Sequence, residues 1–126
     1  MHTAIETQGT TMLVYLEGEL DHHNAGGVRD KIDEFAAAFQ PEHAVLDFGG
    51  VSFMDSSGIG LVMGRYKLLQ AFGCTLELRN LSPHVYNVMR LAGIEKIAVL
   101  KKGKEGREDN ASAKRDETAN GKPFRQ

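Results

Sequence analysis

Apolar and polar positions alternate with two different periods along the first 100 residues, and each change of period marks a boundary between strand and helix. Two β-rich segments come first, at residues 3–8 and 11–17 on either side of the turn Gln8-Gly9-Thr10, and they predict a hairpin. In the second segment Met12, Val14 and Leu16 would share one face, with Leu13 and Tyr15 on the other. Two short apolar runs, at residues 43–48 and 97–100, are typical of strands, and residues 75–78 form a further predicted strand between them.

Between these runs, apolar side chains recur every three or four residues, which is the period of an amphipathic helix. The predicted helices cover residues 25–40, 57–72 and 82–92, and a loop is expected at residues 18–23. Gly73 lies where a left-handed helix cap belongs, and Ser82-Pro83 supplies the N-cap and the first residue of the third helix. We therefore expect the order β-β-α-β-α-β-α-β.

This order predicts a single α/β domain with a small mixed β-sheet, because strands that alternate with helices pair in parallel and the opening hairpin adds an antiparallel strand. Three helices are too few to cover both faces of five strands, so one face should be only thinly covered. Residues 101–126 contain four apolar residues among many charges, too few to offset the entropy of ordering them. We expect a domain at residues 1–100 and a disordered charged tail at residues 101–126.

Charge and cysteine content narrow the possible partners and compartment. Residues 1–100 carry 12 acidic and 7 basic side chains, a net charge of −5, whereas residues 101–126 carry 5 acidic and 8 basic, a net charge of +3. An acidic domain is a poor match for nucleic acid. The single Cys74 fits a reducing compartment, and the first residues lack the basic and apolar regions of a secretory signal. With no apolar run of ~20 residues to span a bilayer, a cytoplasmic protein is the simplest expectation.

The most informative stretch is Phe53-Met54-Asp55-Ser56-Ser57-Gly58-Ile59-Gly60, which lies between a predicted strand and a predicted helix. The first backbone N–H groups of a helix have no partner within it, and they favour an anion, including a phosphate on a nearby serine. Ordinary N-capping, which contributes ~1 kcal/mol, is the plainer explanation of Asp55, Ser56 and Ser57. A single residue would suffice to cap the helix, whereas this stretch has three. The residues alone therefore support ordinary capping and a phosphorylation switch equally.

Other chemistries fit this stretch poorly. A dinucleotide fingerprint needs a third glycine at the position of Met63, and a hydrolase elbow needs a glycine two residues before the serine. The adjacent His22 and His23 point in different directions and have no further ligand at metal-binding spacing, so they more plausibly shape a loop. Gly60 and Gly64 share a helix face, which favours close packing of helix on sheet over a flat patch for a partner. We expect no cofactor, no metal and no enzymatic activity.

Three stretches of the chain closely resemble the anti-sigma factor antagonists of the STAS domain class, particularly the sporulation antagonists that act on sigma F. They are residues 18–23, 53–60 and 64–67, and Ser82-Pro83 and the ending at residues 89–97 also agree. The resemblance covers about residues 3–100. It implies helices packed on one side of a small mixed sheet, and a partner-switching protein that is not itself an enzyme.

In proteins of this family the unmodified antagonist binds an anti-sigma factor that is also a serine kinase, and thereby frees the sigma factor. The resemblance implies that the kinase phosphorylates the first serine of Asp-Ser-Ser-Gly, here Ser56, that the antagonist then dissociates, and that a serine phosphatase restores it. Ser57 would mainly cap the helix. The implied partner-binding surface comprises Asp21, Met54, Asp55, Ser57, Gly58, Ile59 and Gly60.

One departure from the family is Asn24-Ala25-Gly26-Gly27, where relatives usually have better helix formers. The alternative function is a general STAS regulatory module, either a partner switch in a stress response or a sensor of a small ligand. The element Gly18-Glu19-Leu20-Asp21-His22-His23 favours the sporulation antagonists over these.

Overall fold

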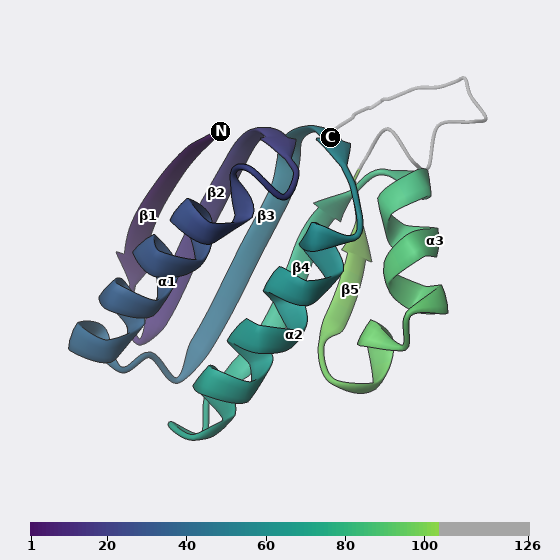
Figure 1. Ribbon diagram of the computed structural model, residues 1–126. Helices are drawn as coiled ribbons and strands as arrows, with labels where there is room; N and C mark the ends of the chain where they lie inside the picture. Colours follow the sequence, from purple (N-terminus) through teal and green to yellow (C-terminus); the bar gives the residue numbers. More distant parts are fainter. Residues whose placement is uncertain (104–126) are drawn as a thin grey trace, which may run out of the picture.

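The computed structural model describes residues 1–103. Its elements follow the expected order, with one additional 3-10 helix before the last strand (Figure 1). They are β1 (His2–Gln8), β2 (Thr11–Leu20), α1 (Ala25–Phe39), β3 (His43–Met54), α2 (Ser57–Gln70), β4 (Thr75–Leu81), α3 (Pro83–Leu91), η1 (Ile94–Lys96) and β5 (Val99–Lys102). The predicted caps are confirmed: Gly73 has a φ of 74°, and Ser82 Oγ accepts a hydrogen bond of 3.2 Å from the Val85 N–H.

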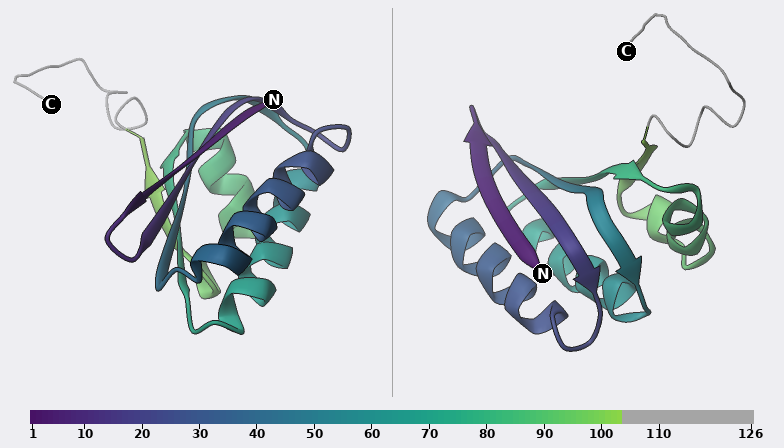
Figure 2. Two further views of the ribbon diagram at one scale, coloured as in Figure 1. Left: turned by 90° about the vertical axis from the view of Figure 1, so that its left-hand side faces the viewer. Right: turned by 90° about the horizontal axis from the view of Figure 1, so that it is seen from above.

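The five strands form one sheet in the order β1-β2-β3-β4-β5, which the sequence did not predict. β1 and β2 are antiparallel, and the other three pairs are parallel, so the mixed sheet is confirmed. α1 and α2 lie side by side on the same face of this sheet (Figures 1 and 2). Among the described residues, no helix is long and apolar enough to cross a membrane.

β2 and β3 are longer than expected. β2 runs on to Leu20, so the prediction of a loop from residue 18 is wrong, and β3 continues past Gly49-Gly50 to Met54. These glycines do not end the strands, because two irregularities in the β2–β3 pairing absorb the local distortion. A side chain at Gly50 would come within 2.9 Å of the Leu16 carbonyl oxygen, so a glycine lets the two strands stay together.

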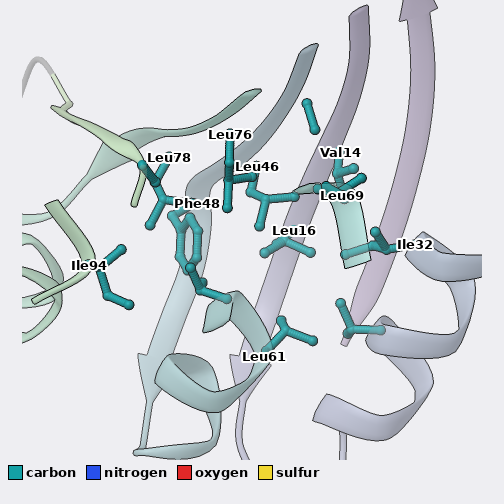
Figure 3. Packing of buried hydrophobic residues seen from close by; sticks show 14 of the residues in the cluster. Val14, Leu16, Ile32, Leu46, Phe48, Leu61, Leu69, Leu76, Leu78 and Ile94 are labelled. Atoms are coloured by element: carbon teal, nitrogen blue, oxygen red, sulfur yellow. The ribbon is translucent and has the colours of Figure 1, made fainter. Parts of the chain in front are cut away.

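The core lies between the sheet and the helices. Met12, Val14 and Leu16 of β2 are buried beneath the helices, whereas Tyr15 is exposed on the opposite face, as the alternation predicted. Figure 3 shows side chains from β2, β3, β4, α1, α2 and η1 meeting in one cluster. Such a continuous core fixes where each strand ends, and therefore where the following loop begins.

The opposite face of the sheet carries charged side chains in place of helices, which agrees with the thin coverage predicted for one face. Glu77 Oε2 lies 2.9 Å from Arg79 Nε and 3.6 Å from Lys101 Nζ. Asn80 Nδ2 donates to Asp47 Oδ2 at 2.8 Å. Paired charges of this kind are stable in solvent and disfavour an apolar cover.

The last strand differs from its prediction at both ends. Ile97 and Ala98 were expected in a strand, but their N–H groups donate to the Ile94 carbonyl oxygen and close a turn after η1. Lys101 and Lys102 were assigned to the tail, yet they belong to β5, in which Lys102 pairs with Leu81 of β4. Their side chains also contact the domain: Lys101 forms an ion pair with Glu77, and Lys102 Nζ lies 4.7 Å from the centre of the Tyr86 ring. The predicted disorder of the tail otherwise concerns residues 104–126, which lie outside the described residues.

Truncation should distinguish the end of the domain from the tail. A chain that ends at Gly103 should keep its thermal midpoint within a few degrees, because the Gly103 N–H still donates to the Leu81 carbonyl oxygen at 2.9 Å. A chain that ends at Leu100 loses that bond and half of β5, and its midpoint should fall by about 5–10 °C, equivalent to ~1–2 kcal/mol. Calorimetry measures both. Equal midpoints for the two truncations would contradict this boundary.

Candidate functional site

The candidate site is formed where β2 and β3 end side by side. These strands are parallel, with Leu20 opposite Met54, so the chain leaves both at the same edge of the sheet. The Asp55 N–H donates to the Leu20 carbonyl oxygen at 3.2 Å and links the two exits. This pairing brings the loop at Asp21 next to the first turn of α2, as the resemblance implied.

Asp55 is the residue that caps α2. Its Oδ1 accepts a hydrogen bond of 2.8 Å from the Ser57 N–H, and its carbonyl oxygen accepts one of 3.0 Å from the Gly58 N–H. The Ser57 N–H is the main reason that the pKa of the Asp55 carboxyl lies below its usual value, and the nearby His22 lowers it further. Asp55 is therefore a fixed negative charge at neutral pH.

Because Asp55 caps the helix, the two serine hydroxyls are not needed for this purpose. The prediction that Ser57 caps α2 is wrong, since Ser57 contributes its N–H and Asp55 supplies the acceptor. Ser56 has helical dihedral angles, and within residues 1–103 its hydroxyl makes no capping hydrogen bond. Its side chain is exposed, so the Ser56 hydroxyl is open to a modifying enzyme.

Asp21 organises its own loop. Its Oδ1 accepts hydrogen bonds from the N–H groups of His23, at 3.1 Å, and Asn24, at 3.0 Å. Its carbonyl oxygen accepts from the N–H groups of Asn24 and Ala25. Asp21 is thus half-buried and partly structural, so a change to alanine would disturb the loop as well as remove a charge.

His22 joins the two loops. It was expected to shape its own loop, but it was not among the predicted site residues. Its Nδ1 lies 3.9 Å from Asp55 Oδ2, and its ring lies 4.1 Å from that of His23. The expectation that the histidines shape the loop is compatible with this arrangement. The approach to Asp55 depends on the pairing of β2 with β3, a contact between distant parts of the chain that local patterns do not reveal.

Gly58 is buried, and its role differs from the one expected. A side chain at Gly58 would lie 2.4 Å from Met54 Sδ and 3.3 Å from Leu20 Cδ2. The space beside Gly58 is therefore filled by Met54 of the same chain and is not open to a partner's backbone. Met54 and Ile59 are half-buried and pack against the core, so each has an internal role.

Gly60 and Phe53, like Ser56, are exposed positions of this region. Among the described residues, and apart from the neighbouring backbone of α2 itself, no atom lies within 4 Å of the position that a Gly60 side chain would take, and the same holds for Gly64. Close packing against the sheet, the favoured explanation of these two glycines, is therefore wrong. Phe53 is 53% exposed, an unusual position for a large apolar side chain and one that the predicted site omitted.

Gly58→Ala should destabilise the domain. Relieving the overlap with Met54 should cost about 1–2 kcal/mol, or about 4–16 °C in thermal midpoint, after the gain in helix propensity is subtracted. The loss should be smaller when Met54 is also changed to alanine, because the clashing atoms are then absent. Gly60→Ala is the matched control and should not lower the midpoint. Equal losses from Gly58→Ala with and without Met54 would show that this contact is not the cause.

α1 and α2 are joined by an ion pair next to the site. Arg65 Nε lies 2.6 Å from Asp33 Oδ1, and Arg65 Nη1 donates to the Leu61 carbonyl oxygen at 3.4 Å. The Arg65 side chain is almost fully buried, so losing Asp33 would leave an unpaired buried charge. This pair ties the middle of α1 to the middle of α2. Within the described part of the chain, no group of three acidic, histidine or cysteine side chains could hold a metal ion.

Comparison with known proteins identifies the family of this domain. Residues 2–105 match the STAS domain. The chain belongs to the STAS domain family. It is 41% identical over 86 residues to the anti-sigma F factor antagonist of Paenibacillus polymyxa, an alignment that covers 68% of this chain and 74% of that protein. The resemblance to anti-sigma factor antagonists is thereby confirmed, and with it the expectation of a regulatory protein that is not an enzyme.

Two solved structures of a relative share the fold of this STAS domain. The unphosphorylated form of the anti-sigma factor antagonist SpoIIAA is 31% identical with a TM-score of 0.66, covering 84% of this chain and 93% of that one. The phosphorylated form of the Bacillus cell fate determinant SpoIIAA is 32% identical with a TM-score of 0.65, covering 84% of this chain and 96% of that one. The mixed sheet with helices mainly on one face is therefore confirmed as the STAS fold.

Proposed function

We propose that this STAS domain is an antagonist of an anti-sigma factor that is also a serine kinase. The unphosphorylated domain binds the kinase and releases a sigma factor, and phosphorylation of Ser56 ends that binding. The observation that carries this proposal is the Ser56 hydroxyl, which is exposed at the start of α2 and free of capping because Asp55 accepts the hydrogen bond from Ser57. Relatives named anti-sigma F factor antagonists support the class of partner.

The existence of SpoIIAA in unphosphorylated and phosphorylated forms supports a switch based on phosphate. A phosphoserine adds a charge of about −1.5 to −2, which the start of a helix tolerates. In a desolvated interface the same charge, beside Asp55, would have to lose its hydration and would repel any acidic group of the partner. A penalty of ~3 kcal/mol weakens binding more than a hundredfold. A serine phosphatase that removes the phosphate completes the cycle.

The structure divides the proposed partner-binding residues into two groups. Ser56 and Gly60 are exposed and would touch the partner directly, with Phe53 beside them. The others shape and support the surface: Asp21 and Ser57 through backbone hydrogen bonds, Asp55 as the cap, and Met54, Gly58 and Ile59 through packing. The expected cytoplasmic location stays a prediction.

Ser56 should be the sole site of phosphorylation by the cognate kinase. Its hydroxyl is exposed, whereas Ser57 is half-buried and its N–H is bonded to Asp55. Incubation with the kinase and ATP, followed by phosphopeptide mapping, tests this proposal with Ser56→Ala and Ser57→Ala as matched variants. Ser57→Ala should still be phosphorylated. Phosphate on Ser57 in the Ser56→Ala protein at the wild-type rate would overturn the assignment.

The second candidate function is a general STAS regulatory module that senses a small ligand. A cavity of about 500 Å³ favours it, at the edge of the sheet opposite Ser56. Apolar groups of Leu76, Ile97 and Val99 line this cavity together with polar groups of Tyr66 and Gln70. A ligand that raised the thermal midpoint without changing binding to the anti-sigma factor kinase would favour the sensor over the antagonist.

A further inference from the structure

The histidine that joins the two loops of the site has no role in the partner switch described so far. His22 Nδ1 lies 3.9 Å from Asp55 Oδ2, while the other oxygen of that carboxylate accepts the hydrogen bond from the Ser57 N–H. Ser56 lies in the chain directly between Asp55 and Ser57, the two residues that this hydrogen bond joins at the start of α2. A phosphate on the exposed Ser56 hydroxyl would be attached next to Asp55, whose carboxylate the His22 ring approaches.

We propose that His22 receives the phosphate of Ser56, acting as a positioning residue that holds the modified side chain against its own domain. The inference rests on the proposed phosphorylation of Ser56. An imidazolium attracts a phosphate dianion more strongly than it attracts the single charge of Asp55 at a similar distance. The His22 ring would thus give up its contact with Asp55 for a contact with the phosphate. Its positive charge would offset the repulsion between the phosphate and the Asp55 carboxylate.

Other polar and charged groups lie near the His22–His23 loop and contribute to its electrostatic environment. The carboxylates of Asp21 and Asp55 lie on the two loops, and the His23 ring stacks beside His22. On the side towards β1, the residues Met1, His2 and Lys31 line a cavity with His23. These groups are present with or without phosphate, so a comparison of the two forms isolates the effect of Ser56.

The pKa of the phosphate reports whether the phosphate lies close to the His22 imidazole. A phosphoserine loses its second proton near pH 6, and a positively charged neighbour favours the dianion that results. The phosphate pKa should therefore be lower when His22 is present.

The test uses the full chain with phosphoserine inserted at position 56 during translation, which requires no kinase. Phosphorus NMR then follows the phosphate pKa in three proteins: with His22 intact, with His22→Asn, and with His84→Asn as a matched control. His84 is likewise exposed but lies on α3. We expect His22→Asn to raise the phosphate pKa by about 0.3–0.7 units, the size of an exposed ion pair, and His84→Asn to leave it unchanged.

The outcomes separate this inference from the proposed function. The His22 side chain is 72% exposed, so the substitution should leave the circular dichroism spectrum intact. An unchanged phosphate pKa in His22→Asn, or the same shift in His84→Asn, would overturn the role of His22 whatever the kinase does. A kinase that ignores Ser56 would instead overturn the proposed function and leave this measurement unaffected.

Discussion

Asp in place of Ser56 should weaken binding to the cognate anti-sigma factor at least tenfold while the domain stays folded. The carboxylate would stand at the start of α2, where a negative charge is tolerated by the helix. In the complex it would lie beside the fixed charge of Asp55 and lose its hydration, a penalty of ~1.4 kcal/mol or more. Isothermal titration calorimetry measures the affinity, and circular dichroism verifies the fold.

Asn at the same position separates charge from size. Ser56→Asn has nearly the shape of Ser56→Asp without the charge, so it should lose much less affinity, and Ser56→Ala should bind as tightly as the wild type. A domain with phosphoserine at position 56 carries nearly twice the charge of aspartate and should bind more weakly still. Equal affinities for the Asp and Asn variants would show that charge is not the switch.

Arg in place of Gly60 should reduce binding to the anti-sigma factor more than a hundredfold and should also prevent phosphorylation of Ser56. Gly60 is exposed one turn after Ser56, and the space beside it is empty among the described residues. A long side chain there would extend into the volume that a kinase must occupy to reach the Ser56 hydroxyl. The domain itself should be stabilised by about 0.5–1 kcal/mol, since arginine favours a helix over glycine.

Gly64→Arg is the matched control for this substitution. Gly64 lies one turn further along α2, and its side-chain position is also open, so the change adds the same size and charge farther from Ser56. Both variants should unfold at or above the wild-type temperature, and only Gly60→Arg should lose its partner. If Gly64→Arg lost as much affinity, the added charge would be responsible and the position of the interface would have to be revised.

Local patterns predicted most elements because helix and strand periods depend on near neighbours. The three helices, the hairpin and the position of the Ser56 loop follow from spacing and capping residues. The lengths of β2 and β3 could not be predicted in this way, because Gly18 and Gly49-Gly50 are typical of turns. Only the pairing between the two strands shows that the chain stays extended at these glycines. The sheet order depends in the same way on contacts between distant segments.

The candidate site could likewise be predicted only in part from local patterns. Asp55, Ser56 and Ser57 were identified from residue types at a strand–helix boundary, but which of them caps the helix depends on a single geometry that the sequence leaves open. The packing of Met54 over Gly58 and the approach of His22 to Asp55 involve side-chain positions that no periodicity encodes. Resemblance to a family located the site, and the contacts explain what each residue contributes.

The pairing of Leu20 with Met54 also has a consequence for newly made chains. The site requires β2, β3 and the first turn of α2 to be in place, and these strands are separated in sequence by the whole of α1. Contacts of such long sequence separation form late and slowly in folding. An unfolded or nascent chain therefore contains Ser56 but lacks the capped, charged surface around it, so the proposed switch would become available only after the domain has folded.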